Sequence, residues 1–249
     1  PPRPAAPPPP PPPGRAAAPP GPPAAPAPAA RAARRRRPLR GGAAVGRPAR
    51  SGKPATRPPA CPYPRGMRAV PASLDPAVVR RVDARLDAVV RDEGVAVPLA
   101  VESGSRAWGF PSPDSDYDCR FVYVRPEADY LDPWPRRDVV ETPRDAVLDV
   151  NGWDLVKAVR LLVRGNATLL EWLRSPIVYR GDPAFRADLL ALAERVVDRD
   201  AVRRHYLHVA LGQRERWWTA DDVPLKKLFY VLRPAATLRW LRVRPDAVP

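Results

Sequence analysis

The stretch GSRAWGFPSPDSDYD (residues 104–118) places a Gly-Ser pair ten residues before two aspartates that are separated by one tyrosine. The residues that follow are rich in β-branched and aromatic side chains, so DYDCRFVYV (116–124) is predicted to be a strand. Alternate strand residues project from the same face, so the carboxylates of Asp116 and Asp118 are expected to lie together. Like charges this close repel each other, and a bound metal ion would resolve that repulsion.

The Gly-Ser pair directly follows another predicted strand, VAVPLAVES (95–103), which is short and apolar. A short helix is predicted at SRAWG (105–109). Glycine at such a turn lets a phosphate approach the backbone closely, and the exposed N–H groups favour an anion. Ser105 adds a hydroxyl donor. A phosphate-binding corner that faces two carboxylates suited to Mg²⁺ is typical of nucleotidyl or phosphoryl transfer.

The pattern around this stretch predicts an α+β fold, with a small mixed β-sheet first and helices after it. SLDPAVVRRVDARLDAVVRDEG (73–94) predicts a helix that is capped by Asp75 and stopped by Gly94. Further strands are expected at DVVET (138–142) and AVLDV (146–150). After Gly152 only helices are expected, the last of them interrupted by Pro234.

These motifs resemble the DNA polymerase β-like nucleotidyltransferases, whose pattern is Gly-[Gly/Ser], nine to thirteen residues, and then Asp-x-[Asp/Glu]. The longer string GSRAWGFPSPDSDYD is similar to one subgroup, the RNA-repair-pathway DNA polymerase β family, and the resemblance covers most of residues 95–240. Ser103 departs from the superfamily pattern, which has an apolar residue there. The resemblance implies a third acidic residue between apolar neighbours on a later strand. Asp149, in Leu-Asp-Val, matches that context, and Glu141 is the alternative.

The resemblance also implies the chemistry. Gly104 and Ser105 would contact a triphosphate, and Asp116, Asp118 and Asp149 would bind two Mg²⁺ ions, with Mn²⁺ as an alternative metal. The expected reaction moves an NMP from an NTP to an acceptor hydroxyl with release of pyrophosphate. The acceptor stays open, with RNA as one candidate. The alternative function is a catalytically silent module of the same fold that binds nucleotide or RNA.

Two arginines, a lysine and a tyrosine are expected around the same nucleotide. Arg106 adjoins the Gly-Ser pair and would neutralise phosphate charge. Lys226, Tyr230 and Arg233 recur at helical spacing, so they share one helix face that would line the nucleotide pocket.

The formal charge of +15 belongs to the tail of the chain rather than to its folded part. Residues 1–66 hold 13 Lys/Arg, no acidic residue and 23 of the 38 prolines, a composition that predicts disorder. Three interpretations stay open: a basic tether for nucleic acid or an acidic surface, a start site assigned too far upstream of Met67, and a transit peptide. The expected organisation is this tail, a nucleotidyltransferase core (67–151) and a helical region (152–249) that is truncated if relatives continue further.

The chain has no run of 18 apolar residues, so no membrane-spanning helix and no membrane partner are expected. Its two cysteines, Cys61 and Cys119, lie in different parts of the chain and indicate a reducing compartment, so a cytoplasmic location is expected.

Overall fold

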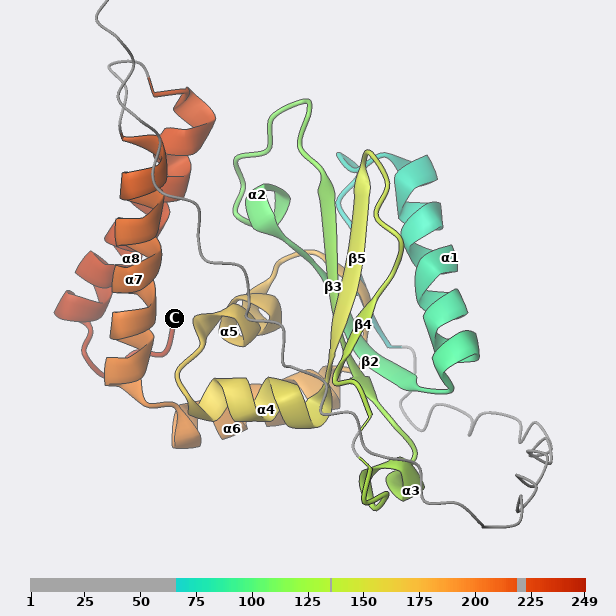
Figure 1. Ribbon diagram of the computed structural model, residues 1–249. Helices are drawn as coiled ribbons and strands as arrows, with labels where there is room; N and C mark the ends of the chain where they lie inside the picture. The colour runs from blue at the N-terminus through green and yellow to red at the C-terminus, as the bar shows by residue number, and fades with distance from the viewer. Residues whose placement is uncertain (1–65, 135, 219–222) are drawn as a thin grey trace, which may run out of the picture. The chain divides into compact units, whose positions relative to one another are not determined.

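The computed structural model describes residues 66–134, 136–218 and 223–249. The tail predicted for residues 1–66 therefore lies outside the described residues, apart from Gly66. The centre of the described part is a six-stranded mixed sheet with the strand order β1-β6-β2-β3-β5-β4, and Figure 1 shows helices against both of its faces. The fold is α+β, as the pattern of the sequence predicts.

Six strands make the sheet: β1 (Met67–Ala69), β2 (Ala96–Ser103), β3 (Tyr117–Val124), β4 (Val139–Glu141), β5 (Leu148–Asp154) and β6 (Val178–Gly181). The described helices are α1 (Pro76–Glu93), α2 (Gly104–Ala107), α3 (Glu127–Tyr130), α4 (Leu155–Val163), α5 (Ala167–Arg174), α6 (Pro183–Val196), α7 (Arg199–Trp217) and α8 (Leu225–Val243).

Among the helices of the described residues, α1 is the one that covers the first face of the sheet. It begins where the Asp75 side chain accepts a hydrogen bond from the backbone of Ala77 (2.7 Å), and it ends at Gly94, whose φ of 64° is a left-handed conformation that favours glycine. Its valine and leucine stripe packs against alternate side chains of the strands, with Phe121 and Tyr179 completely or almost completely buried beneath it. The predicted helix and both of its boundaries are confirmed.

The opposite face of the sheet packs against the later helices. The cluster there joins β2, β3 and β6 to α4, α5, α6, α7 and α8, with Leu162 and Leu170 fully buried. Four of these helices begin at a side-chain cap: Asp154, Asn166, Asp182 and Asp198 each accept from a backbone N–H of the first turn. Across the described residues, no helix combines the length and the apolar character that crossing a membrane requires.

Strand pairing brings the quoted motif together. Strands β2 and β3 are antiparallel, with Ser103 opposite Asp118, while β3 and β5 are parallel, with Asp118 opposite Asp149. The end of β2, the start of β3 and the start of β5 therefore lie side by side at one end of the sheet. The predicted strands 95–103 and 116–124 are confirmed within a residue or two.

The prediction that only helices follow Gly152 is wrong in two places. Strand β5 continues to Asp154, and β6 (178–181) joins the sheet between β1 and β2. Strand β6 has four residues between two helices, with Val178 buried on one face of the sheet and Tyr179 on the other, and it is too short to show a period in the sequence.

The prediction that Pro234 interrupts the last helix is also wrong. Helix α8 runs through Pro234 from Leu225 to Val243. Proline removes one backbone hydrogen bond and normally bends or breaks a helix. Here Pro234 is buried and α8 packs along α7, so tertiary packing compensates for the lost bond.

Candidate active site

The Gly-Ser corner lies directly against one of the predicted metal ligands. Gly104 has a φ of 64°, and a Cβ placed on it would lie 2.5 Å from Asp118 Oδ2. Any other residue would therefore be strained and would collide with the carboxylate. The sequence thus requires glycine here for two reasons, its backbone conformation and the close approach of β3.

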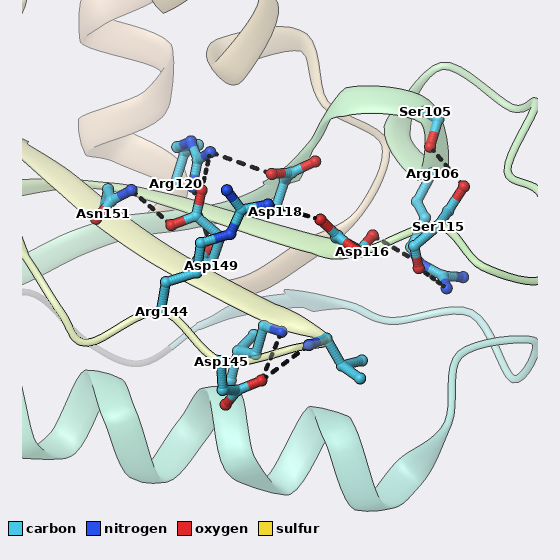
Figure 2. A network of polar contacts seen from close by, with 12 residues as sticks. Ser105, Arg106, Ser115, Asp116, Asp118, Arg120, Arg144, Asp145, Asp149 and Asn151 are labelled. Carbon is cyan, nitrogen blue, oxygen red and sulfur yellow. Dashed lines mark hydrogen bonds and ion pairs between the residues drawn. The ribbon is translucent and has the colours of Figure 1, made fainter. Parts of the chain in front are cut away.

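Ser105 stabilises the loop that follows the corner. Its side chain is buried, and its Oγ donates to Ser115 Oγ (3.1 Å), which also accepts from the backbone N–H of Ser112. Figure 2 shows this pair at one end of the polar network. The Ser105 hydroxyl therefore has a structural partner, and contact between Ser105 and a triphosphate stays a prediction.

Arg106 stabilises the same loop. Its guanidinium donates to the backbone carbonyls of Ser115 (2.7 Å) and Asp116 (3.1 Å) and stacks 3.9 Å from the ring centre of Tyr117. These contacts fix the backbone from which Asp116 projects. The guanidinium also keeps a positive charge beside the corner, and its neutralisation of phosphate charge stays a prediction.

Asp118 and Asp149 converge on a single positive group. Arg120, two residues beyond Asp118 on β3, donates through Nη2 to Asp118 Oδ1 (3.1 Å) and to Asp149 Oδ2 (2.8 Å). Figure 2 shows Arg120 reaching both carboxylates. Asp149 is also held on its other oxygen, because Asn151 Nδ2 donates to Oδ1 (2.7 Å). Burial raises the pKa of the Asp118 carboxyl, the nearby Arg120 charge lowers it, and the Asp149 and Asp116 charges raise it.

Asp116 lies just before β3 and is more exposed than the other two acids. Its Oδ2 accepts a hydrogen bond from Arg144 Nη2 (2.9 Å), and the Arg144 side chain is 68% exposed. The structure thus brings Asp118 and Asp149 together, whereas Asp116 forms an ion pair with Arg144 at the surface. In the part of the chain that the structure describes, no group of three or more acidic, histidine or cysteine side chains forms a ready metal site.

The residues present nevertheless fit a divalent cation. Asp118 and Asp149 already bind one positive group between them, and their carboxylate oxygens are the hard ligands that Mg²⁺ and Mn²⁺ prefer. Arg144 is exposed, so Asp116 can turn away from it toward Asp118 at low cost, because a surface ion pair is worth roughly 0–1 kcal/mol.

Glu141 was the alternative to Asp149 as the third acid. It lies on β4, the edge strand, where its exposed side chain is paired with Arg137. Asp149 stands directly opposite Asp118 in the parallel ladder. The geometry therefore favours Asp149 over Glu141.

The predicted face of α8 packs on the loop that joins the corner to β3. Lys226 Nζ lies 3.7 Å from Asp114 Oδ1, Tyr230 contacts Trp108 at 5.6 Å between ring centres, and the Arg233 guanidinium lies 3.7 Å from the Trp108 ring centre. The three side chains therefore share one face, as their spacing predicts. Whether that face binds nucleotide stays a prediction.

Two of these α8 side chains have further polar partners. Arg233 Nη1 donates to Glu171 Oε1 (2.7 Å), which also accepts from the Tyr206 hydroxyl (3.0 Å). Burial raises the pKa of the Tyr230 phenol, the Asp118 charge raises it further, and a hydrogen bond with Ser105 opposes both. Tyr230 therefore lies close to Ser105 at the Gly-Ser corner.

The sequence interpretation missed Glu102. This side chain is completely buried, and its carboxylate accepts from the backbone N–H of Asp118 (2.8 Å) and from the Tyr179 hydroxyl. Burial raises the pKa of the Glu102 carboxyl to about 7. It thus holds the backbone of a candidate metal ligand from inside the fold. The available signal was a lone acid in the apolar run VAVPLAVES.

Arg120 and Asn151 were also missed, although strand alternation could have found them. Arg120 is two residues after Asp118, and Asn151 is two residues after Asp149. Each must therefore lie on the same face of the sheet as the acid that precedes it.

Comparisons with known proteins give the family of the chain. One curated relative is the Uncharacterized protein YcgL of Bacillus subtilis (strain 168), which is 41% identical over 162 residues; the match covers 65% of this chain and 62% of that relative's length. The model of the RNA repair pathway DNA polymerase beta family matches residues 78–249, which include the corner, all three acids and the α8 face. The chain therefore belongs to the RNA repair pathway DNA polymerase beta family.

Proposed function

We propose that the protein is a metal-dependent nucleotidyltransferase that moves an NMP from an NTP to an acceptor hydroxyl and releases pyrophosphate. One observation carries the proposal: Asp118 stands opposite Asp149 in the parallel ladder, and its free oxygen faces the Gly104 corner. This arrangement places a candidate cation site directly beside a candidate phosphate site, with Asp118 between them.

Each residue then has a specific task. Gly104 lets the triphosphate approach the backbone, and Asp116, Asp118 and Asp149 would supply the negative charge of a site for divalent metal, Mg²⁺ or Mn²⁺. When bound, the metal neutralises the charge that develops on the phosphate and orients the attacking and leaving oxygens. Glu102 and Arg106 keep the Asp116–Asp118 backbone in place through hydrogen bonds to its N–H and carbonyl groups. The protein groups therefore act by positioning and electrostatics.

The distribution of charge supports an anionic acceptor. Residues 199–249 hold 11 Lys/Arg and 5 Asp/Glu, whereas residues 67–198 hold 18 and 22. The basic excess thus lies in the α7–α8 part of the chain, whose Tyr230 reaches the Gly-Ser corner. RNA is the acceptor we propose, since a polyanion is attracted to such a surface.

The test is transfer of label from each α-labelled NTP, with Mg²⁺, to a mixed pool of RNA and protein acceptors. Asp118→Asn and Asp149→Asn keep the side-chain shape and are expected to abolish transfer. Glu141→Gln, the matched control, removes the alternative third acid and is expected to leave transfer intact. Thermal unfolding of each variant checks that the fold survives.

Two results would contradict the proposal. Equal labelling by Asp118→Asn and by the wild-type protein would show that the assigned residues are not the active site. Tight NTP binding by the wild-type protein, with no label transferred to any acceptor, would favour the catalytically silent module instead.

A further inference from the structure

We propose that Arg120 is a resident cation of this site, so that the carboxylates bind one divalent ion, held by Asp116 and Asp118, rather than two. The inference rests on the proposed function, because it concerns the metal that this function requires. It differs from the expectation of two ions that the resemblance supports, and it follows from the contacts of Arg120.

Arg120 is anchored independently of the carboxylates it bridges. Its Nη1 donates to the backbone carbonyls of Asp149 (3.1 Å) and Cys119 (3.2 Å), in addition to the two carboxylate bonds of Nη2. The side chain is only 20% exposed. Backbone carbonyls of a paired strand cannot turn away, so the guanidinium keeps its place between the two acids even if a carboxylate rotates.

The carboxylate oxygens divide into those already bonded and those that are open. Both oxygens of Asp149 have partners, Oδ2 with Arg120 and Oδ1 with Asn151. Asp118 Oδ1 also bonds Arg120, whereas Asp118 Oδ2 points at Gly104. The open oxygen therefore faces the phosphate corner. An ion bound there would use Asp118 Oδ2 and Asp116, and it would not require Asp149.

The charges give the same count. Asp116, Asp118 and Asp149 carry three negative charges, and Arg120, which bridges two of them, carries one positive charge, so the two negative charges that remain match one divalent ion. In a two-metal site the ions lie roughly 3.5–4 Å apart. A second ion between Asp118 and Asp149 would have to take the position of the Arg120 guanidinium, which already places a positive charge there.

Electron paramagnetic resonance of Mn²⁺ tests the inference, because it counts bound ions and separates isolated ions from coupled pairs. The full-length protein is titrated with Mn²⁺ in the presence of α,β-methylene-ATP, which cannot transfer its nucleotide. The wild-type chain is expected to bind one Mn²⁺ with an uncoupled spectrum. Arg120→Gln, which keeps polarity and removes the charge, is expected to bind a second ion and to show a coupled pair.

Two further variants serve as controls. Arg120→Lys keeps a positive charge at the position and is expected to bind one ion. Arg144→Gln removes a cation that does not stand between the acids, so one ion is expected there too. Thermal unfolding is measured for all variants. If Arg120→Gln does not fold, Arg120→Lys is compared with the wild-type protein instead. A coupled pair of ions in Arg120→Lys would overturn the role of the positive charge at this position.

The possible outcomes separate the inference from the proposed function. Two coupled ions in the wild-type protein would overturn the inference and leave the proposed function standing. One ion in both the wild-type protein and Arg120→Gln would overturn the role of Arg120. No bound ion in the wild-type protein would overturn both. One ion in the wild-type protein and two in Arg120→Gln would support the inference.

Discussion

Replacing Glu102 by glutamine is expected to change how stability depends on pH. The Glu102 carboxyl is completely buried, and burial is the main cause that raises its pKa from 4.5 to about 7. Hydrogen bonds from Tyr179 and from the backbone of Asp118 oppose that shift only in part. In the unfolded chain the same carboxyl titrates near its ordinary value.

The sign follows from which state holds the proton. Between pH 4.5 and about 7 the native chain keeps a proton on Glu102 that the unfolded chain has released. The free energy of unfolding therefore falls as the pH rises through this window, and the loss is complete above the native pKa. The difference between the two pKa values corresponds to about 3 kcal/mol.

Urea unfolding, followed by tryptophan fluorescence over a series of pH values, measures the effect. Glu102→Gln has no proton to release, so its free energy of unfolding, relative to the wild-type value, should rise by about 3 kcal/mol from below pH 4.5 to above pH 7. Asp118 also has a raised pKa, but it is present in both proteins and cancels in the comparison. Glu141→Gln, at an exposed position, should show no such change.

The reasoning would be refuted if the curves of Glu102→Gln and the wild-type protein ran parallel across the whole range. That result would mean that the Glu102 carboxyl has the same pKa in the native state as in the unfolded chain. The buried carboxylate would then be fully compensated by its two donors, and burial would not dominate its environment.

Glycine substitutions give the remaining predictions. Gly104→Ala should abolish binding of a fluorescent NTP analogue while the chain still folds. The reason is that the new Cβ would lie 2.5 Å from Asp118 Oδ2 at a residue whose φ is 64°. Unchanged affinity for the analogue would show that the corner does not bind phosphate. Gly152→Ala places a Cβ 2.1 Å from Phe121 Cε2 in the core, so urea unfolding should show a loss of roughly 1–3 kcal/mol. A Cβ added at Gly212, which lies inside α7, has no atom within 4 Å, so Gly212→Ala should stabilise the protein by roughly 0.5–1 kcal/mol. Equal effects of Gly152→Ala and Gly212→Ala on the free energy of unfolding would contradict the packing argument.

The parts of the fold that the sequence predicts well are those with a local physical cause. Helix α1 has its cap, its stop and its apolar stripe in one segment, and α5 has a visible cap at Asn166. Strand β6 has no such cause, because its place between β1 and β2 depends on pairing with residues far away in the sequence, such as Leu99 with Gly181 and Met67 with Gly181. Four residues cannot specify that pairing without the rest of the sheet.

The candidate site shows the same limit. The Gly104 corner and the Asp116–Asp118 pair are local, so their spacing alone predicts them. The place of Asp149 opposite Asp118 depends on the parallel register of β3 and β5. The resemblance favoured Asp149 for that position with Glu141 as the alternative, but the sequence alone does not show which acid faces Asp118, because that depends on the strand order of the sheet.

The repulsion between neighbouring carboxylates was the first argument for a metal ion, and it identifies a need for positive charge without identifying its source. In the structure two arginines already meet part of that need: Arg120 bridges Asp118 and Asp149, and Arg144 pairs with Asp116. The alternation rule that aligns Asp116 with Asp118 also places Arg120 on the same face. Strand patterns that predict a metal site should therefore be examined for a cation two residues further on, because such a residue changes how many ions the site needs.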